Sequence, residues 1–234
     1  LKTLPNFTIM YLPNDHTAGL KVGTPTPRTM MADNDFALGR IIDRITHSRF
    51  WKTTCIFVIE DDPQDGWDHV DGHRSTCLVI SPYTKRGVTV SKFYNQTSVV
   101  HTMERMMGLT AANQLYAASP LMTDCFTAAI DATPFAHLKN IVPLCEIHAA
   151  VEPEKKWGRA HDEALKWELA TENLPLDKPD MADEDTLNRI LWFAAKGNVP
   201  YPKEVAGAHG KGLAAIGLKL DGSVVEDDED DDDD

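Results

Sequence analysis

Apolar residues in the first 145 positions alternate between short continuous runs and a helical spacing. Residues 7–12 form a short β-type run, and the continuous apolar runs at residues 55–59 and 77–81 are typical of buried β-strands. Between the first two runs, residues 32–51 repeat apolar positions with the period of a helix, and Asp33 or Asn34 is a plausible N-cap. This alternation predicts an α/β fold with a mainly parallel sheet flanked by helices.

A second helix is predicted after the third apolar run. Residues 97–108 carry the helical spacing, with Thr97 or Ser98 as the cap and Gly108 as the stop. Asp35 and Asp43 lie in the earlier amphipathic segment, away from the strand ends. We therefore predict that these two carboxylates are helix-surface or capping residues and do not bind metal.

The alternation fades after about Cys145 and gives way to two amphipathic helical patterns. Residues 152–173 form the first, and residues 183–198 form the second, which starts at Asp183 and stops at Gly197. Their Trp and Leu positions are interpreted as packing surface: Trp157, Leu165, Trp167, Leu187, Leu191 and Trp192. The expected organisation is a domain over 1–145, a mostly helical extension over 146–225 and an acidic tail over 226–234.

Charge excludes some classes of protein. The net charge is −13 over 234 residues, but the nine acids of residues 226–234 account for most of it and leave −4 for the rest. Such a tail cannot bury apolar area and is expected to be solvated. No basic stripe offsets the charge, so nucleic acid is not an expected partner, and no apolar run is long enough to span a membrane. The opening, which lacks Met, indicates a piece of a longer polypeptide.

The four cysteines show no CxxC pairing, which argues against a zinc ribbon. Cys55 and Cys77 lie in apolar runs and are predicted to be buried. Cys125 and Cys145 flank a proline-containing segment and could pair in an oxidising compartment, which their spacing does not decide.

Acids and histidines cluster after two of the predicted strands. Ligands of an α/β sheet bind at the carboxyl ends of its parallel strands. Carboxylates that lie close together there repel one another unless a cation or water surrounds them. "PNDHTAG" follows the first strand, and "EDDPQDGWDHVDGH" follows the second. The candidate metal ligands are Asp15, His16, Asp61, Asp62, His69 and His73.

Imidazole together with carboxylate is the ligand set of zinc, manganese or iron, whereas calcium and magnesium prefer oxygen alone. Zinc or manganese is therefore expected, with calcium or magnesium as alternatives. A solvated acidic loop is the competing interpretation of the same residues. If the metal interpretation is right, Asp61 and His73 (or His69) converge with Asp15 and His16 on one cavity.

The two stretches "LPNDHTAGLKVGTPTPRTMMADNDFALGRIIDRITHSRFW" and "IFVIEDDPQDGWDHVDGHRSTCLVISPYTKRG" resemble the C-terminal half of the alkaline phosphatase superfamily core. They are most similar to bacterial phosphoesterases of the phospholipase C and acid phosphatase type, some of them fused to a β-propeller. The resemblance covers roughly residues 5–145. It implies a metal-dependent phosphoester hydrolase acting on a small phosphoester, and a periplasmic or secreted location.

The resemblance also assigns individual positions. In the superfamily's phosphomutases a strand ends in Asp-His-Gly, and a further His precedes the next strand. Asp61 then takes the Asp position, Asp62 the His position, and His73 or His69 the later His. Asp15 and His16 fall on an earlier Asp and His segment, although those two ligands are usually spaced apart and are adjacent here.

One departure concerns the nucleophile. In these enzymes a Ser or Thr follows the first strand together with a metal-binding Asp, and Thr3 and Thr8 lack neighbouring acids. The resemblance thus implies that the nucleophile belongs to a missing N-terminal half, in the same or another chain, and that residues 1–234 hold no catalytic residue. A non-catalytic cation-binding or structural protein is the alternative, and a phosphomutase is a third.

Overall fold

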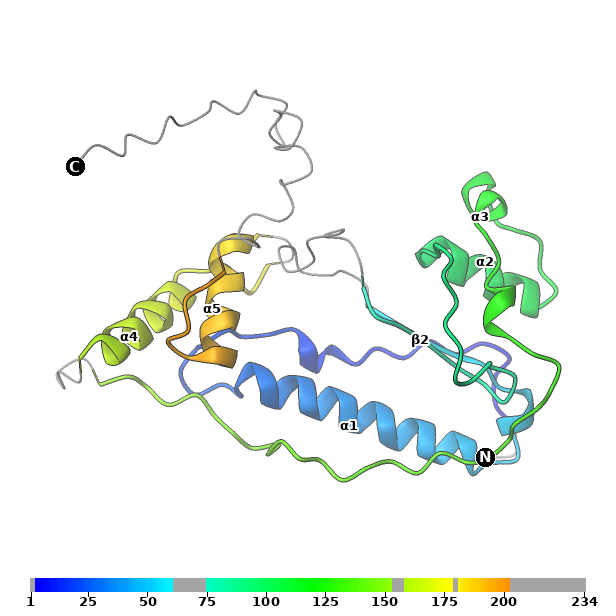
Figure 1. The fold of residues 1–234 in the computed structure, drawn as a ribbon, viewed down its shortest axis with the longest axis horizontal. Coiled ribbons are helices and arrows are strands. Elements are labelled where there is room, and N and C mark those ends of the chain that lie inside the picture. The colour runs from blue at the N-terminus through cyan, green and yellow to red at the C-terminus, as the bar shows by residue number, and fades with distance from the viewer. Residues whose placement is uncertain (1–2, 61–74, 153–157, 179–180, 203–234) are drawn as a thin grey trace. The chain divides into compact units, whose positions relative to one another are not determined.

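The computed structural model describes residues 3–60, 75–152, 158–178 and 181–202. It divides into two compact units, each described by itself below. The first unit comprises Leu1–Pro13, Asn34–Asp61 and Ser75–Ile141, and the second comprises Asn14–Asp33, Asp62–Arg74 and Val142–Asp234. The α-helices are α1 (Pro27–Thr46), α2 (Gln96–Met106), α3 (Gln114–Ala118), α4 (Arg159–Glu172) and α5 (Glu184–Lys196), and the strands are β1 (Ile56–Ile59) and β2 (Cys77–Ile80) (Figure 1).

Helix α1 begins five residues before its predicted start. Pro27 occupies the first position, where a missing N–H costs no hydrogen bond and the fixed φ suits a helix. Asp33 and Asn34, predicted as caps, therefore lie inside the helix, and Asn34 donates to the carbonyl of Leu12 at 2.8 Å. The predicted caps were wrong. Asp33 and Asn34 belong to residue types that often cap helices, but here the helix has already begun at Pro27.

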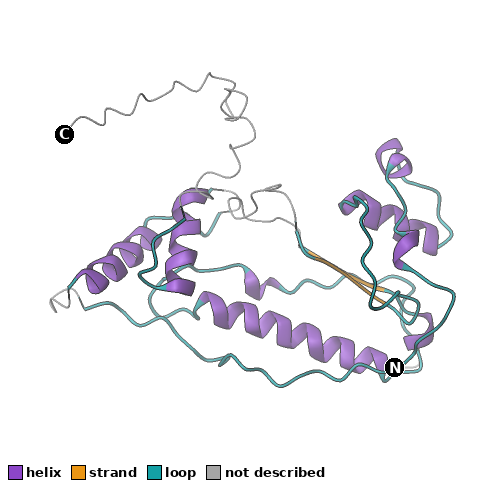
Figure 2. Cartoon of the chain, viewed as in Figure 1, coloured by secondary structure: helices purple, strands orange, loops and turns teal. Residues whose placement is uncertain are grey.

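The apolar runs at 55–59 and 77–81 form strands, as predicted, but their pairing differs. β1 and β2 pair antiparallel, with Ile56 opposite Ile80 and Ile59 opposite Cys77. They make a two-stranded sheet in the part of the chain that the structure describes (Figure 2). The mixed helix and strand content is consistent with an α/β fold. The described strands do not form the predicted parallel sheet.

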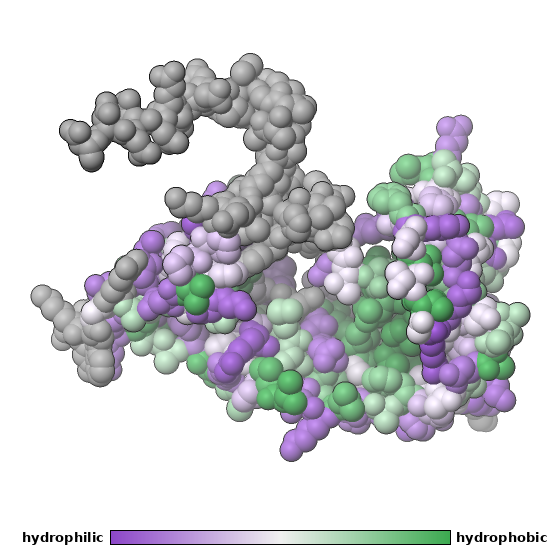
Figure 3. Space-filling view, in the orientation of Figure 1, coloured by the Kyte–Doolittle hydropathy of each residue, from purple (hydrophilic) through white to green (hydrophobic). Residues whose placement is uncertain are grey.

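The strands are also less covered than their continuous apolar runs indicated. Ile59 and Leu78 are each 42% exposed. The space-filling view shows hydrophobic residues at the surface around this hairpin (Figure 3). A two-stranded hairpin is marginal by itself, so β1 and β2 depend on packing against the rest of the first unit.

The third predicted strand, residues 7–12, is not a strand in the structure. These residues adopt no regular secondary structure, and Ile9 and Tyr11 are 80% and 73% exposed. β-propensity expresses how well a residue fits a half-buried pleated surface, and no described strand pairs with this segment.

Helix α2 starts one residue before the predicted segment because Asn95, not Thr97 or Ser98, is the N-cap. The Asn95 side chain accepts from the Ser98 N–H at 2.9 Å, and the Ser98 hydroxyl accepts from the Asn95 N–H, which makes a capping box. Gly108 follows the end of the helix with a φ of 73°, as predicted for its stop. Val99 of α2 is buried, as are Ile42, Trp51 and Met122 of the same unit.

Replacing Asn95 with alanine is expected to lower the free energy of unfolding by about 1 kcal/mol, the usual cost of losing an N-cap. Asn113, which caps the five-residue α3 by accepting from the Tyr116 N–H, is the matched control. Because α3 is short and lacks buried residues, Asn113→Ala should cost less in the same urea titration. A larger loss at Asn113 would contradict the ranking.

The second unit is built on α4 and α5. Asp183 caps α5 by accepting from the Thr186 N–H at 2.9 Å, and Gly197 ends it, as predicted. Leu187 is buried as predicted, and Ile190 is completely buried. Trp157 lies outside the described residues. No described helix is long and apolar enough to cross a membrane.

All four cysteines are free: Cys55, Cys77, Cys125 and Cys145. The pairing of Cys125 with Cys145, left open by the sequence, is not made in this structure. Cys77 is exposed, so its predicted burial was wrong, and Cys55 is half-buried. Burial raises the pKa of the Cys55 thiol to about 11, which keeps it protonated and unreactive at neutral pH.

Candidate functional site

The structure describes two of the six predicted metal ligands. Asp15 ends a 3-10 turn, η1 (Pro13–Asp15), and His16 follows it with an exposed side chain. After these residues the chain turns, and Gly19 donates its N–H to the Thr17 hydroxyl at 3.0 Å. Asp61, Asp62, His69 and His73 lie outside the described residues. Their convergence with Asp15 and His16 therefore stays a prediction.

Glu60, directly after β1, is the last described residue before the acidic loop. The Glu60 carboxylate accepts from the Thr76 N–H at 3.1 Å, which joins the two sides of the hairpin just before β2. The Glu60 carbonyl accepts from the Gln96 side chain at 2.9 Å, so the first residue of α2 lies against the carboxyl end of β1. Glu60 and Thr76 thus hold together the two ends of the segment 61–74, which carries four of the predicted ligands and lies outside the described residues.

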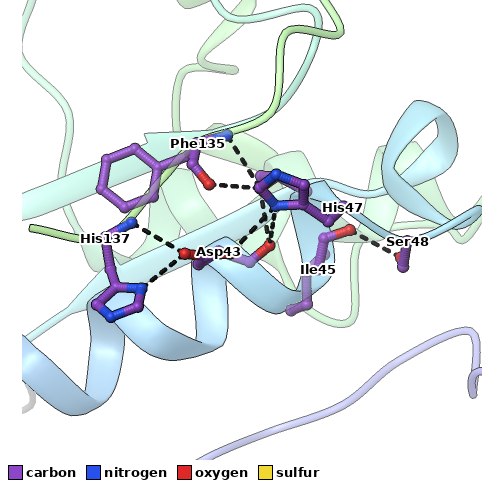
Figure 4. Close-up of polar contacts among 7 residues, drawn as sticks. Asp43, Ile45, His47, Ser48, Phe135 and His137 are labelled. Carbon is purple, nitrogen blue, oxygen red and sulfur yellow. Dashed lines mark hydrogen bonds and ion pairs between the residues drawn. The ribbon is translucent and has the colours of Figure 1, made fainter.

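A separate polar cluster lies at the C-terminal end of α1, in the first unit (Figure 4). Asp43 accepts two hydrogen bonds from His137 on one oxygen, from ring Nδ1 at 2.6 Å and from the backbone N–H at 3.0 Å. Its other oxygen lies 3.1 Å from His47 Nδ1. Both imidazoles face a carboxylate through Nδ1, so Nδ1 carries the proton in each ring.

His137 is held by more than its bonds to Asp43. Its ring meets the Phe36 ring edge-on at 5.8 Å, and its Cβ would lie 3.5 Å from a Cβ added at Gly39. Two residues earlier, the Phe135 N–H donates to the Thr46 hydroxyl at 3.0 Å, which fixes the backbone of the same segment onto α1. The His137 ring is therefore oriented by Asp43 and Phe36, and its backbone segment is held on α1 by the Phe135–Thr46 hydrogen bond.

Asp35 lies exposed on α1, as predicted for a helix-surface residue, whereas Asp43 is engaged by both histidines. The hydrogen bonds from His137 are the main cause of a lowered Asp43 pKa. The sequence carried half of the signal, since Asp43 and His47 are four residues apart on a helix. His137 is 94 residues away in the chain, and no local pattern connects it to Asp43.

Asp43→Asn is expected to destabilise the first unit at neutral pH, because the neutral amide loses the charge-assisted hydrogen bond from His137 and the electrostatic contact with His47, while the His47 bond to the Asp43 carbonyl remains. A lowered folded-state pKa contributes stability above the unfolded value, about 3.9, and that stability is lost as the pH falls through the folded value. The difference in urea midpoint between wild type and Asp43→Asn should therefore shrink as the pH falls below about 3.9. A pH-independent difference would contradict the assignment, and Asp35→Asn serves as the exposed control.

Within the described ranges no three His, Cys, Asp or Glu side chains are arranged to hold a metal ion. Asp43, His47 and His137 illustrate the reason, because each imidazole nitrogen that approaches Asp43 is already hydrogen-bonded to it. This cluster is accordingly an Asp–His network, and the donor set that suits a metal remains the one predicted from the sequence.

The second unit contains a His–carboxylate contact that is more deeply buried. Glu168 of α4 is 8% exposed, and its carboxylate accepts from the Val151 N–H at 2.9 Å. The same oxygen lies 3.5 Å from His148 Nε2. These contacts hold the segment before α4 against that helix, and we interpret their role as structural.

Comparison with known proteins gives one family. Residues 25–110 match the model of the Phosphoesterase family. The match runs from the start of α1 through β1, the acidic loop and β2 to the end of α2, and supports a phosphoester hydrolase. It includes Asp61, Asp62, His69 and His73, while Asp15 and His16 precede it. No curated protein matches the chain.

Proposed function

We propose that this chain is the C-terminal part of a metal-dependent phosphoester hydrolase of the alkaline phosphatase superfamily, of the bacterial phospholipase C and acid phosphatase type. The observation that carries the proposal is the family match over residues 25–110, which contains the acidic loop between β1 and β2. The proposed organisation has this part in 1–145, a helical extension in 146–225 and an acidic tail in 226–234.

The proposed metal ligands are Asp15, His16, Asp61, Asp62 and His73 or His69. Carboxylates with imidazoles suit zinc or manganese, and calcium or magnesium would use the carboxylates alone. The exposed His16 side chain, one residue after η1, is accessible to such an ion. Bound metal would polarise a phosphoryl oxygen and activate a nucleophile. The Asp43–His137 network supports α1 and takes no part in this step.

The nucleophile is expected to lie outside residues 1–234. Thr8 sits in an exposed segment without regular structure, which is unsuited to preorganising an attacking hydroxyl. We propose that the Ser or Thr nucleophile belongs to an N-terminal half, in the same or another chain, that completes the domain. The substrate class is a small phosphoester, and the location is the periplasm or the cell exterior.

Two other functions compete with this one. A cation-binding or structural protein would keep the ligands without turnover, and a phosphomutase would return the phosphoryl group to its substrate. The family match favours hydrolysis over mutase chemistry.

Metal binding tests the ligand assignment. Titration of residues 1–234 with Zn²⁺ or Mn²⁺ is expected to reveal a site that Asp61→Ala/Asp62→Ala weakens at least tenfold. The matched control is Asp230→Ala/Asp231→Ala, which removes two carboxylates from the acidic tail and should change that affinity less than twofold. Equal effects of the two variants would mean that net charge alone attracts the cation, and the ligand assignment would then fail.

Turnover tests the division of the catalytic machinery. Purified residues 1–234 with an aryl phosphate and added zinc or manganese should show no turnover in the usual enzyme range, roughly 1 per second or above. A rate in that range that Asp61→Ala abolishes would show that residues 1–234 already contain the nucleophile.

A further inference from the structure

An open depression of about 680 Å³ lies along α1 beside the His137 segment, entirely within the first unit. Successive turns of α1 contribute both apolar and charged residues to its lining. The residues that line it are Ala37, Arg40, Ile41, Asp43, Arg44, Ile45 and His137.

The apolar part of the lining is contiguous. Ala37, Ile41 and Ile45 follow one another at intervals of four residues, so they lie one above the other on a single helix face. This stripe offers contact to an apolar body without any polar group that must be satisfied.

The charged part of the lining is basic. Arg40 and Arg44 are also four residues apart, and both side chains are exposed. The Arg40 guanidinium lies 5.7 Å from the centre of the Phe36 ring, which restricts where it points. Within the described residues, neither arginine forms an ion pair with a carboxylate, so both guanidinium groups keep their donors for another anion.

His137 adds a third donor in its protonated form. Nδ1 donates to Asp43, and Figure 4 shows the second ring nitrogen, Nε2, pointing away from that carboxylate. When the ring is protonated, it donates from Nδ1 to Asp43 and from Nε2 outward. A protonated ring between Asp43 and a bound anion would satisfy both charges, which offsets the repulsion between Asp43 and that anion.

We propose that this depression binds an organic phosphate monoester. The two guanidinium groups and Nε2–H of His137 would contact the phosphate oxygens, while the apolar stripe of Ala37, Ile41 and Ile45 contacts the organic group. Three terminal oxygens match three separate donor groups, whereas a carboxylate has only two. The site uses none of the six predicted metal ligands and is independent of the proposed hydrolysis.

Phenyl phosphate is the probe, titrated into residues 1–234 in the presence of EDTA so that no metal contributes. A Kd on the order of 1 mM is expected for a ligand of this size on an open surface. Arg40→Gln/Arg44→Gln should weaken binding at least tenfold. The matched control, Arg49→Gln/Arg105→Gln, removes two exposed arginines outside the depression and should weaken it less than twofold.

Three ligands and one further variant complete the test. Inorganic phosphate should bind more weakly than phenyl phosphate, because it cannot use the apolar stripe, and benzoate more weakly still. Binding of phenyl phosphate should be unchanged in Asp61→Ala/Asp62→Ala, which separates this site from the proposed metal site. The proposal is overturned if wild type does not bind phenyl phosphate, if both arginine pairs matter equally, or if benzoate binds as tightly.

Discussion

Ile190→Ala is expected to lower the free energy of unfolding by about 3–4 kcal/mol, among the largest effects of any single truncation in the second unit. Its side chain has no solvent exposure, and removing three buried carbons costs their transfer free energy and leaves a cavity. Ile141→Ala makes the same chemical change at a side chain that is 98% exposed and should cost less than about 0.5 kcal/mol.

Urea titrations of both variants against wild type measure the difference. If the two substitutions had similar costs, Ile190 would not be the centre of a folded core, and α4 and α5 would be independent helices. A reduced urea dependence in Ile190→Ala, together with a lower midpoint, would indicate that the second unit unfolds separately from the first.

This core bears on the proposed metal site because it holds the chain just after two predicted ligands. The Leu20 N–H donates to the Thr171 hydroxyl of α4 at 3.3 Å, and Leu20 itself is 4% exposed. Asp15 and His16 are therefore only a few residues from a point that α4 and α5 fix. Helix α4 thus anchors the chain shortly after the segment that contains Asp15 and His16.

Helix positions could be predicted from the sequence because their signals are local. Asp183 and Gly197 bounded α5 correctly, since a cap and a stop act within one turn of the helix. The start of α1 failed for the same reason, because Asp33 imitated a cap while Pro27 opened the helix.

Strand pairing could not be predicted in the same way. The runs at 55–59 and 77–81 were placed correctly, but the direction in which they pair depends on the path of the chain between them, and periodicity says nothing about that path. The run at 7–12 shows the other limit, because strand propensity has no effect where no partner strand lies alongside.

The candidate sites divide along the same line. The candidate metal ligands of the acidic segment could be proposed from the sequence because they lie within a few residues of one another, and the family match spans the same residues. The network of Asp43 with His137 was missed because its two halves are 94 residues apart. Chemistry assembled by tertiary contacts leaves no periodic trace in the chain.

Gly19→Ala is expected to lower the free energy of unfolding by about 3 kcal/mol, for two separable reasons. Gly19 has a φ of +59°, a conformation that costs a residue with a Cβ roughly 1–2 kcal/mol. A Cβ at this position would also lie 2.9 Å from Thr171 Cγ2, so the packing of α4 would have to shift, at about 1–3 kcal/mol. Gly23, with a φ of +80° and no atom within 4 Å of an added Cβ, is the matched control that isolates the first cost.

The second cost can be removed independently through Thr171→Ser, which deletes the clashing methyl group and keeps the hydroxyl that accepts from Leu20. In that background Gly19→Ala should cost less than in wild type and approach the cost of Gly23→Ala, because the contact left is with the Thr171 hydroxyl at 3.2 Å. Urea titrations of the four combinations at positions 19 and 171 give the coupling energy directly. A coupling energy near zero would mean that the loop does not pack against α4 at Gly19. The core formed by α4 and α5 would then not fix the position of Asp15 and His16.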